Sequence, residues 1–104
     1  MAISGQSLAD GQLPAAKGTL FTATSITYEK TISLCNVAAT TETVKIYFNR
    51  AATGVSRRIR TVVLAPDAAY EVTIALPMSI GDLLEGETTN ATSVDYVIGG
   101  GITS

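Results

Sequence analysis

Residues 42–50 read ETVKIYFNR, and this stretch decides the fold class. Val44, Ile46 and Phe48 alternate with more polar residues, so the apolar side chains recur with a period of two. In an extended strand this period places all three on one face, whereas an amphipathic helix needs apolar residues at positions i, i+3 and i+4. The stretch therefore predicts a β-strand with one buried face.

The same period recurs in short runs along the rest of the chain, between turn signals such as Pro66 and Pro77. The expected strands are residues 19–24, 28–36, 42–50, 57–64, 70–76, 82–86 and 92–98. About seven strands at spacings of roughly ten residues are typical of two packed antiparallel sheets. We predict an all-β protein: a single antiparallel β-sandwich or jelly-roll-like barrel with almost no helix.

The alternation also predicts which side chains face the core. In the run 28–36, Ile32 and Leu34 share a phase and are expected to point inward. In the run 70–76, the inner stripe is expected to be Tyr70, Val72, Ile74 and Leu76. The run 57–64 has apolar residues in both phases, and a β-bulge near Thr61 would reconcile them.

The two ends of the chain differ in composition from this central region. We expect an extended N-terminal arm over residues 1–16, the sandwich domain over 17–98 and a short C-terminal tail over 99–104. The apolar residues of the arm are Ile3, Leu8 and Leu13. We expect the arm to add a strand to an exposed sheet edge of a neighbouring subunit. The alternative is an arm that folds back on its own domain.

Composition excludes several kinds of site. The chain has 104 residues, no His and one Cys. A His-based catalytic centre, a His-containing metal site and an intramolecular disulfide are therefore excluded by count. No apolar run approaches the roughly 18 residues of a membrane span, and no secretory leader is visible, so we expect synthesis in a cytoplasm. Cys35 is expected to be a reduced, half-buried strand residue.

Charge is distributed unevenly along the sequence. The net charge is −2, which argues against a nucleic-acid-binding protein. Residues 1–60 hold seven cations and three acids, a net charge of +4, whereas residues 61–104 hold six acids and no cation, a net charge of −6. If the two halves occupy different faces, the molecule is a dipole suited to contacts between copies. Alternatively, strands from both halves interleave and the dipole cancels.

The densest basic feature is the run Arg57, Arg58 and Arg60. Strand alternation is expected to place Arg58 and Arg60 on the same side. One interpretation is a contact with an acidic patch of a partner protein. The other is a charged edge strand that resists aggregation. We take the three arginines, together with Ile3, Leu8 and Leu13, as the candidate partner interface.

The acidic residues Asp82, Glu85 and Glu87 lie close together in the sequence. Their spacing differs from that of a Ca²⁺-binding loop, in which Asp or Asn alternates and a distal Glu follows a Gly. Glu85 and Glu87 share one face of the expected strand, which is interpreted as a solvated face without cations. We therefore predict no catalytic residues, no metal and no cofactor.

A set of strand ends and turns resembles a known class of proteins. The segments are TISLCN at 31–36, VKIYF at 44–48, LAP at 64–66, YEV at 70–72 and Gly81-Asp82. In this order they resemble small β-sandwich structural proteins of tailed bacteriophage virions. The resemblance covers about residues 18–98. It implies a protein made in the host cytoplasm and located in the virion.

The resemblance further implies a non-enzymatic capsid decoration or cement protein that stabilises the phage head by protein–protein contacts. Its expected partners are copies of itself and the major capsid protein or another virion protein, with no nucleic acid and no membrane. The alternative is a small tail or baseplate module, or a receptor- or glycan-binding module. A glycan-binding module needs exposed aromatic side chains in loops, and the candidates are Tyr28 and Tyr47. An enzyme is the weakest interpretation.

Overall fold

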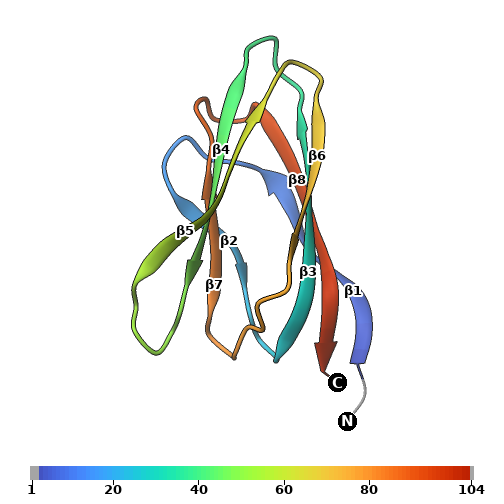
Figure 1. The fold of residues 1–104 in the computed structure, drawn as a ribbon, viewed down its shortest axis with the longest axis vertical. Coiled ribbons are helices and arrows are strands. Elements are labelled where there is room, and N and C mark those ends of the chain that lie inside the picture. The colour runs from blue at the N-terminus through green and yellow to red at the C-terminus, as the bar shows by residue number, and fades with distance from the viewer. Residues whose placement is uncertain (1–2, 104) are drawn as a thin grey trace.

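The computed structural model describes residues 3–103, except for the side chains of residues 3–7, 29, 102 and 103. These residues form strands and loops with no helix among them, so none of the described elements is a helix able to cross a membrane. The strands are β1 (Ile3–Gln12), β2 (Gly18–Thr22), β3 (Thr27–Asn36), β4 (Glu42–Asn49), β5 (Ser56–Leu64), β6 (Ala69–Ile74), β7 (Leu83–Glu87) and β8 (Val94–Thr103) (Figure 1).

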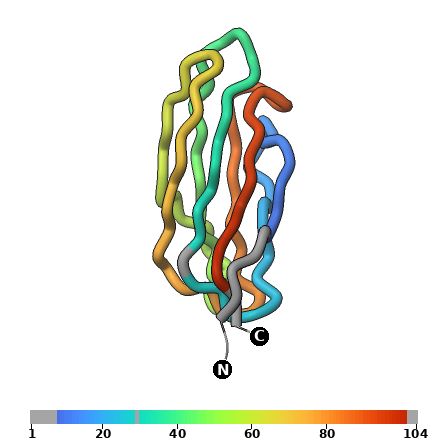
Figure 2. Tube along the Cα trace, turned by 90° about the vertical axis from the view of Figure 1, so that its right-hand side faces the viewer, coloured from blue at the N-terminus to red at the C-terminus, as the bar shows by residue number. Residues whose placement is uncertain are grey.

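The strands form two four-stranded antiparallel sheets packed face to face. Sheet A has the order β1-β8-β3-β6, and sheet B has the order β2-β7-β4-β5. Figure 2 looks onto sheet A, with sheet B behind it. This confirms the predicted all-β sandwich, although the described residues form eight strands rather than about seven. The additional strand is β1.

The N-terminal segment was expected to be an arm reaching a neighbouring subunit, and this expectation is corrected. Residues 3–12 pair with β8 along nearly their whole length, with Ile3 opposite Thr103 and Gln12 opposite Asp95. The expected C-terminal tail is likewise the second half of β8. Backbone pairing explains both corrections, because each segment satisfies the N–H and C=O groups of the other without needing many apolar side chains. Met1, Ala2 and Ser104 lie outside the described residues.

Strand β5 departs from simple alternation, as expected, but two residues earlier than predicted. Tyr47 lies opposite Arg58 and Ile46 opposite Arg60, so Ile59 is the extra residue of a bulge. A bulge leaves two residues facing one on the partner strand and shifts the phase of everything beyond it. The predicted position near Thr61 was therefore close, and the bulge does reconcile the two apolar phases.

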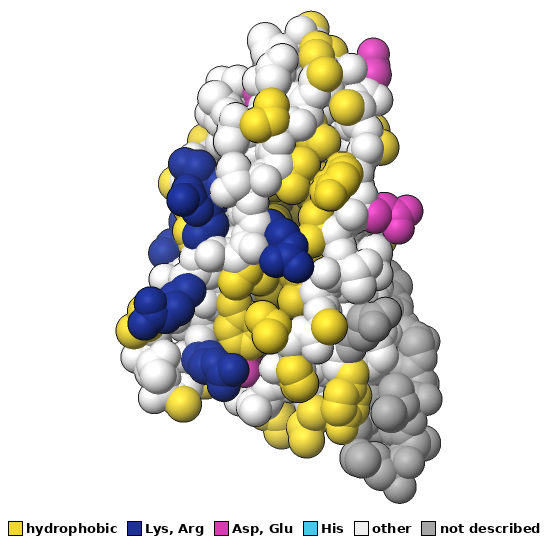
Figure 3. All heavy atoms as spheres, viewed as in Figure 1, with side chains coloured by type: hydrophobic (Ala, Val, Ile, Leu, Met, Phe, Trp, Pro, Cys, Tyr) yellow, Lys and Arg dark blue, Asp and Glu magenta, His cyan; other side chains and the backbone are white. Residues whose placement is uncertain are grey.

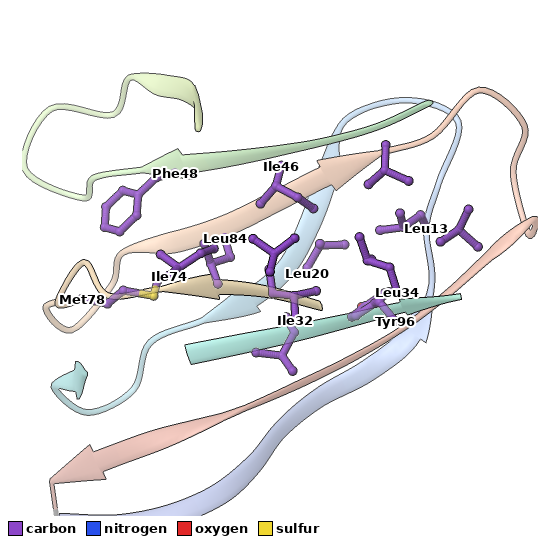
Figure 4. Close-up of a cluster of buried hydrophobic side chains, with 14 of the residues drawn as sticks. Leu13, Leu20, Ile32, Leu34, Ile46, Phe48, Ile74, Met78, Leu84 and Tyr96 are labelled. Carbon is purple, nitrogen blue, oxygen red and sulfur yellow. The ribbon is translucent and has the colours of Figure 1, made fainter. Parts of the chain in front are cut away.

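The core lies between the sheets. In β4 every second residue is buried, as the sequence predicts. Figure 4 shows Ile32 and Ile74 of sheet A pointing toward Ile46 and Leu84 of sheet B. The predicted inner stripe of β6 is only half correct, because Leu76 lies beyond the strand and is 46% exposed. Tyr70 is also largely exposed, since β6 is an edge strand.

Buried polar side chains fix the loops at both ends of the sandwich. The upper end carries the β3–β4, β5–β6 and β7–β8 loops, and the lower end carries the β2–β3, β4–β5 and β6–β7 loops (Figure 1). At the upper end, Asn36 Nδ2 donates to the Leu64 carbonyl oxygen (3.0 Å). At the lower end, the Asp82 carboxylate accepts from the backbone N–H groups of Ala51 and Ser79, both at 2.9 Å. Asn36 and Asp82 thus hold separate chain segments together.

One carboxylate is completely buried at the upper end. Glu42 precedes the apolar stripe of β4 and has 0% exposure. Its oxygens accept hydrogen bonds from Thr88 Oγ1 (3.0 Å), Thr40 Oγ1 (3.2 Å) and both the N–H and the Nδ2 of Asn90 (2.8 Å each). Burial by itself raises the pKa of this carboxyl, but the four hydrogen bonds outweigh it and the pKa is lowered. Glu42 therefore stays ionised and joins the β3–β4 and β7–β8 loops.

One lysine is completely buried at the lower end. Lys30 has 0% exposure and lies in phase with the core residues of β3. Its Nζ donates to the carbonyl oxygens of Tyr28 (2.8 Å) and Leu76 (2.5 Å). Burial lowers the pKa of this ammonium group, because the charged form loses hydration. No carboxylate forms an ion pair with Lys30 among the described residues.

A candidate protein-binding surface

The two sheets carry opposite net charges. The strands of sheet A contain four acidic residues and one lysine, a net charge of −3, whereas those of sheet B contain four cations and three acids, a net charge of +1. Each sheet contains strands from both halves of the chain, so the halves interleave as one alternative proposed. The positive and negative charges nevertheless remain separated, because the β5 arginines lie in sheet B and most of the unpaired acidic residues lie in sheet A.

Charges on the outer face of sheet B are largely compensated within the sheet. Glu87 lies 3.8 Å from the Lys45 ammonium and accepts a 3.1 Å hydrogen bond from the Tyr47 hydroxyl. Lys17 lies over the Tyr47 ring, 5.1 Å from its centre. Burial, the hydrogen bond to Glu87 and the charge of Glu87 together raise the pKa of Tyr47. These side chains form a connected network that needs no partner molecule.

This network corrects the interpretation of the acidic cluster as a solvated face without cations. Glu87 has Lys45 beside it, and Glu85 accepts a 2.6 Å hydrogen bond from Ser56 Oγ. The third member, Asp82, is buried at a loop and points elsewhere. Within residues 3–103, as far as their side chains are described, no group of three or more acidic or Cys side chains is placed to hold a metal ion.

The outer face of sheet A is acidic. Its register aligns Asp10, Val97, Ser33 and Glu71 in one row across all four strands, and Asp95 lies in the next row. The three carboxylates are exposed, and no Lys or Arg accompanies them on the described part of this face. Cys35 lies on the same face and is half-buried, as expected. A surface of small residues and uncompensated carboxylates suits a basic partner.

The predicted basic residues lie on an edge strand. Arg57, Arg58 and Arg60 are exposed on β5, and none of them forms an ion pair with a described residue. The expectation that Arg58 and Arg60 share a side is wrong, because the bulge at Ile59 changes the phase between them. Arg58 lies beside Tyr47 on the outer face of sheet B, and Arg57 lies opposite Phe48 on the inner side.

An apolar groove opens between β5 and β6 and was missed by the sequence analysis. Its volume is about 300 Å³, and its lining includes Phe48, Val55, Leu76, Arg50 and Arg57. The Arg50 guanidinium lies over the Phe48 ring at 5.7 Å. Figure 3 looks onto this edge and shows hydrophobic side chains between the strands, with Lys and Arg side chains gathered on the β5 side. No local pattern predicts the groove, because it depends on two edge strands diverging toward the lower end.

The apolar residues of the predicted arm belong to the domain itself. Leu13 is 1% exposed within the core, and Leu8 packs against the core. The Leu13 side chain is therefore unavailable for a neighbouring subunit, which corrects its assignment to a partner interface, whereas Leu8 is only partly buried. Ile3 lies in β1, and its side chain is outside the described residues.

Comparisons with known proteins give similarity in structure but not in sequence. No protein-family model matches the chain, and no curated protein matches it. A solved structure from Bacillus endospore appendages, described as disulfide-linked pili, aligns with a TM-score of 0.62 and 14% identity, covering 97% of this chain and 88% of that one.

Two further solved structures are similar. A chain of infectious bursal disease virus, Gx strain, has a TM-score of 0.53 and 10% identity; the alignment covers 94% of this chain and 32% of the viral chain. Eiger TNF from S. frugiperda has a TM-score of 0.51 and 7% identity, with coverage of 95% and 94%. At these identities the comparisons show only that this chain shares its fold with these three structures.

Proposed function

We propose that this protein is a non-enzymatic structural protein that works by binding copies of itself and another protein of a larger particle. The observation that carries the proposal is the pair of uncompensated charged surfaces, namely the acidic outer face of sheet A and the arginines of β5. Neither surface has counter-charges of its own, so each would interact most favourably with a partner of opposite charge. The shared fold with pilus and virus structures supports the same role.

We further propose that the particle is a virion and that the protein decorates or cements a phage head. The support is the resemblance of the strand ends and turns at 31–36 and 81–82 to tailed-phage structural proteins. Asn36 and Asp82 of these motifs hold loops in place, which suits residues that define a fold. Binding only the mature head would stabilise it by RT ln(1 + [L]/Kd) per site, about 2.7 kcal/mol at a hundredfold excess over Kd.

A tail, baseplate or receptor-binding module is the alternative within the same particle. The glycan-binding version loses its main support, because Tyr28 and Tyr47 lie in strands β3 and β4 and are partly buried rather than presented by loops. Tyr47 also has its hydroxyl committed to Glu87. Head decoration therefore remains the proposal to be tested first.

Co-sedimentation tests the proposal directly. Purified protein is mixed with complete virions and with empty heads of the phage whose genome encodes it, and the bound protein is quantified after centrifugation. Stoichiometric binding to both particles supports head decoration. Binding to complete virions but not to empty heads would indicate that the protein belongs to the tail. No binding to either particle would contradict a virion role.

A charge reversal on sheet A sharpens this test. Asp10→Lys places a cation in the row that includes Glu71, and we expect it to lower the bound fraction several-fold, because it repels a basic partner surface. The matched control is Lys45→Gln on the outer face of sheet B, whose charge is already paired with Glu87 within the sheet, and this variant should bind as the wild type does. Equal loss in both variants would mean that the sheet A face is not the binding surface.

A further inference from the structure

We propose that the β5 edge binds an extended acidic segment of a partner protein, which adds a strand to sheet B and places an apolar side chain in the groove between β5 and β6. This binding mode rests on the proposed function, because it names the chemistry of the partner that the β5 arginines bind. Three features of the edge support it, namely the side on which the arginines lie, the open apolar groove and the unpaired backbone of β5.

Two of the three β5 arginines lie on the inner side of the edge strand. Arg57 is opposite Phe48 and Arg60 is opposite Ile46, which are both core residues of β4, whereas Arg58 lies on the outer face. Residues opposite each other in an antiparallel pair share a face, so Arg57 and Arg60 lie on the side of β5 that faces sheet A. Because Phe48 and Ile46 are two residues apart, the two arginines are about 7 Å apart along the strand. Both are exposed, and neither forms an ion pair with a described side chain.

The groove beside these arginines is apolar and open. Phe48 lies in its lining, and Val55 and Leu76 are 45% and 46% exposed within it. Arg50 and Arg57 also line the groove, so cations border the apolar surface. Figure 3 shows Lys and Arg side chains around the hydrophobic side chains exposed at this edge. A ligand that fits both features carries an apolar group next to carboxylates.

The backbone of β5 is free to pair with such a ligand if the ligand is an extended chain. Strand β5 pairs with β4 alone, so its other edge has no strand partner among the described residues. Its nine residues are enough to pair with a segment of about seven residues. Alternate side chains of an added strand lie on the groove side, where they meet first the groove, then Arg57, then Arg60. In the antiparallel direction, the segment therefore reads acidic-x-acidic-x-apolar.

The same arginines exclude uncharged strands. An apolar strand added to β5 would cover Arg57 and Arg60 without supplying counter-charges, and inward-pointing charges of this kind protect sheet edges from such pairing. The bulge at Ile59 adds to this protection, since its carbonyl oxygen accepts a 2.8 Å hydrogen bond from Arg60 Nη1. An acidic strand forms ion pairs with both arginines instead. The edge thus selects its partner by charge, and the groove selects it by the apolar side chain.

Peptide binding to the full chain tests this binding mode. The probe is the blocked peptide Thr-Glu-Thr-Glu-Thr-Leu-Thr, and its affinity is measured by isothermal titration calorimetry. We expect the peptide to bind and to slow hydrogen exchange at the β5 amides that point away from β4. Replacing both Glu by Gln, or Leu by Ser, should each lower the affinity more than about fivefold, because each removes one of the two features that the edge selects.

Variants of the chain locate the site. Arg57→Gln should lower the affinity more than about fivefold, whereas Lys45→Gln, which removes one cation from the outer face of sheet B, should bind as the wild type does. In the antiparallel register, Arg57 faces the Glu nearer to the Leu. Arg57→Glu should therefore prefer the peptide in which Lys replaces that Glu, which reverses the wild-type preference. Circular dichroism checks that every variant is folded.

The outcomes separate this binding mode from the particle proposal. No binding at millimolar peptide, equal affinity for the Glu and Gln peptides, or unchanged exchange at β5 overturns the binding mode. Decanoate that binds when the peptide does not would also overturn it, in favour of a site for small amphiphiles. Failure of the peptide together with stoichiometric binding to heads overturns the β5 binding mode alone. Peptide binding by a protein that is absent from every particle overturns the particle proposal alone.

Discussion

Each end of the sandwich contains one charged side chain with 0% exposure, and the two environments differ. At the upper end, Glu42 receives four hydrogen bonds from two loops, and the pKa of its carboxyl falls despite complete burial. At the lower end, Lys30 donates to two carbonyl oxygens, and the pKa of its ammonium falls because burial is not outweighed. Relative to water, the upper end stabilises its ion, whereas the lower end destabilises its ion.

The comparison shows that hydrogen bonds, rather than burial, decide whether a buried charge strengthens this fold. Each buried ion loses several kcal/mol of hydration, and compensation requires that nearly all its donor or acceptor positions be used. Glu42 meets that requirement and Lys30 does not. The upper end should therefore depend on its charge for stability, and the lower end should tolerate its removal.

The largest expected effect comes from removing the carboxylate at the upper end. Glu42→Ala leaves the hydroxyls of Thr40 and Thr88 and two donors of Asn90 without their acceptor. We expect a loss of about 3 kcal/mol in the free energy of unfolding, measured by urea denaturation. Glu85→Ala, which removes a single hydrogen bond to Ser56, is the control and should lose less than about 1 kcal/mol. Equal losses would contradict the special role of the upper end.

An intermediate effect is expected from acid. Because the folded pKa of Glu42 lies below its ordinary value of 4.5, the stability from its ionisation is fully present above that value and is lost as pH falls through the folded pKa. Between about pH 5 and pH 2 the wild type should lose more stability than Glu42→Gln, which has no proton to bind. Parallel pH profiles of the two proteins, measured by thermal unfolding, would contradict the assignment of this stability to the ionised Glu42.

The smallest expected effect is at the lower end. In Lys30→Met the buried charge is removed while the apolar stem is kept, and we expect the free energy of unfolding to stay within about 1 kcal/mol of wild type. The folded pKa of Lys30 is lowered from 10.5, so the unfolded chain binds the extra proton and this group makes wild-type stability rise toward pH 10.

Subtracting the Lys30→Met profile isolates this rise from the opposite contributions of Tyr47 and Tyr96, whose pKa values are raised by burial first of all. A loss of several kcal/mol in Lys30→Met would show that the two hydrogen bonds to carbonyl oxygens stabilise the lower end. It would contradict the conclusion that only the upper end depends on its buried charge.

The sequence pattern predicted which side chains face the core better than it predicted which charged side chains are buried. Lys30 and Glu42 lie in phase with the inner residues of β3 and β4, although neither was named among the expected core residues. Their charge argued for exposure, and only the hydrogen-bond partners from distant loops explain their burial. Strand β1 carries few apolar residues and no clear alternation, so no side-chain signal revealed a strand held mainly by backbone pairing with β8.

Parts of the candidate surface were predictable and parts were not. The arginines at 57–60 were singled out from the sequence, with a charged edge strand as one of two interpretations, and β5 is an edge strand. Their sides were assigned wrongly, because a bulge shifts phase without any sequence mark of its exact position. The groove beside them arises where β5 and β6 diverge, which depends on how the two sheets pack.

The pairing of β1 with β8 has a consequence for folding. The first described strand finds its neighbour only in the last, so sheet A cannot be completed before residues 94–103 are available for pairing. Until then, β8 is missing from between β1 and β3, and the core side of sheet B stays partly open to water. Closure over nearly the whole chain length is entropically slow. Folding of this domain should therefore wait for β8, with the edges of β1 and β3 exposed to other copies during that interval.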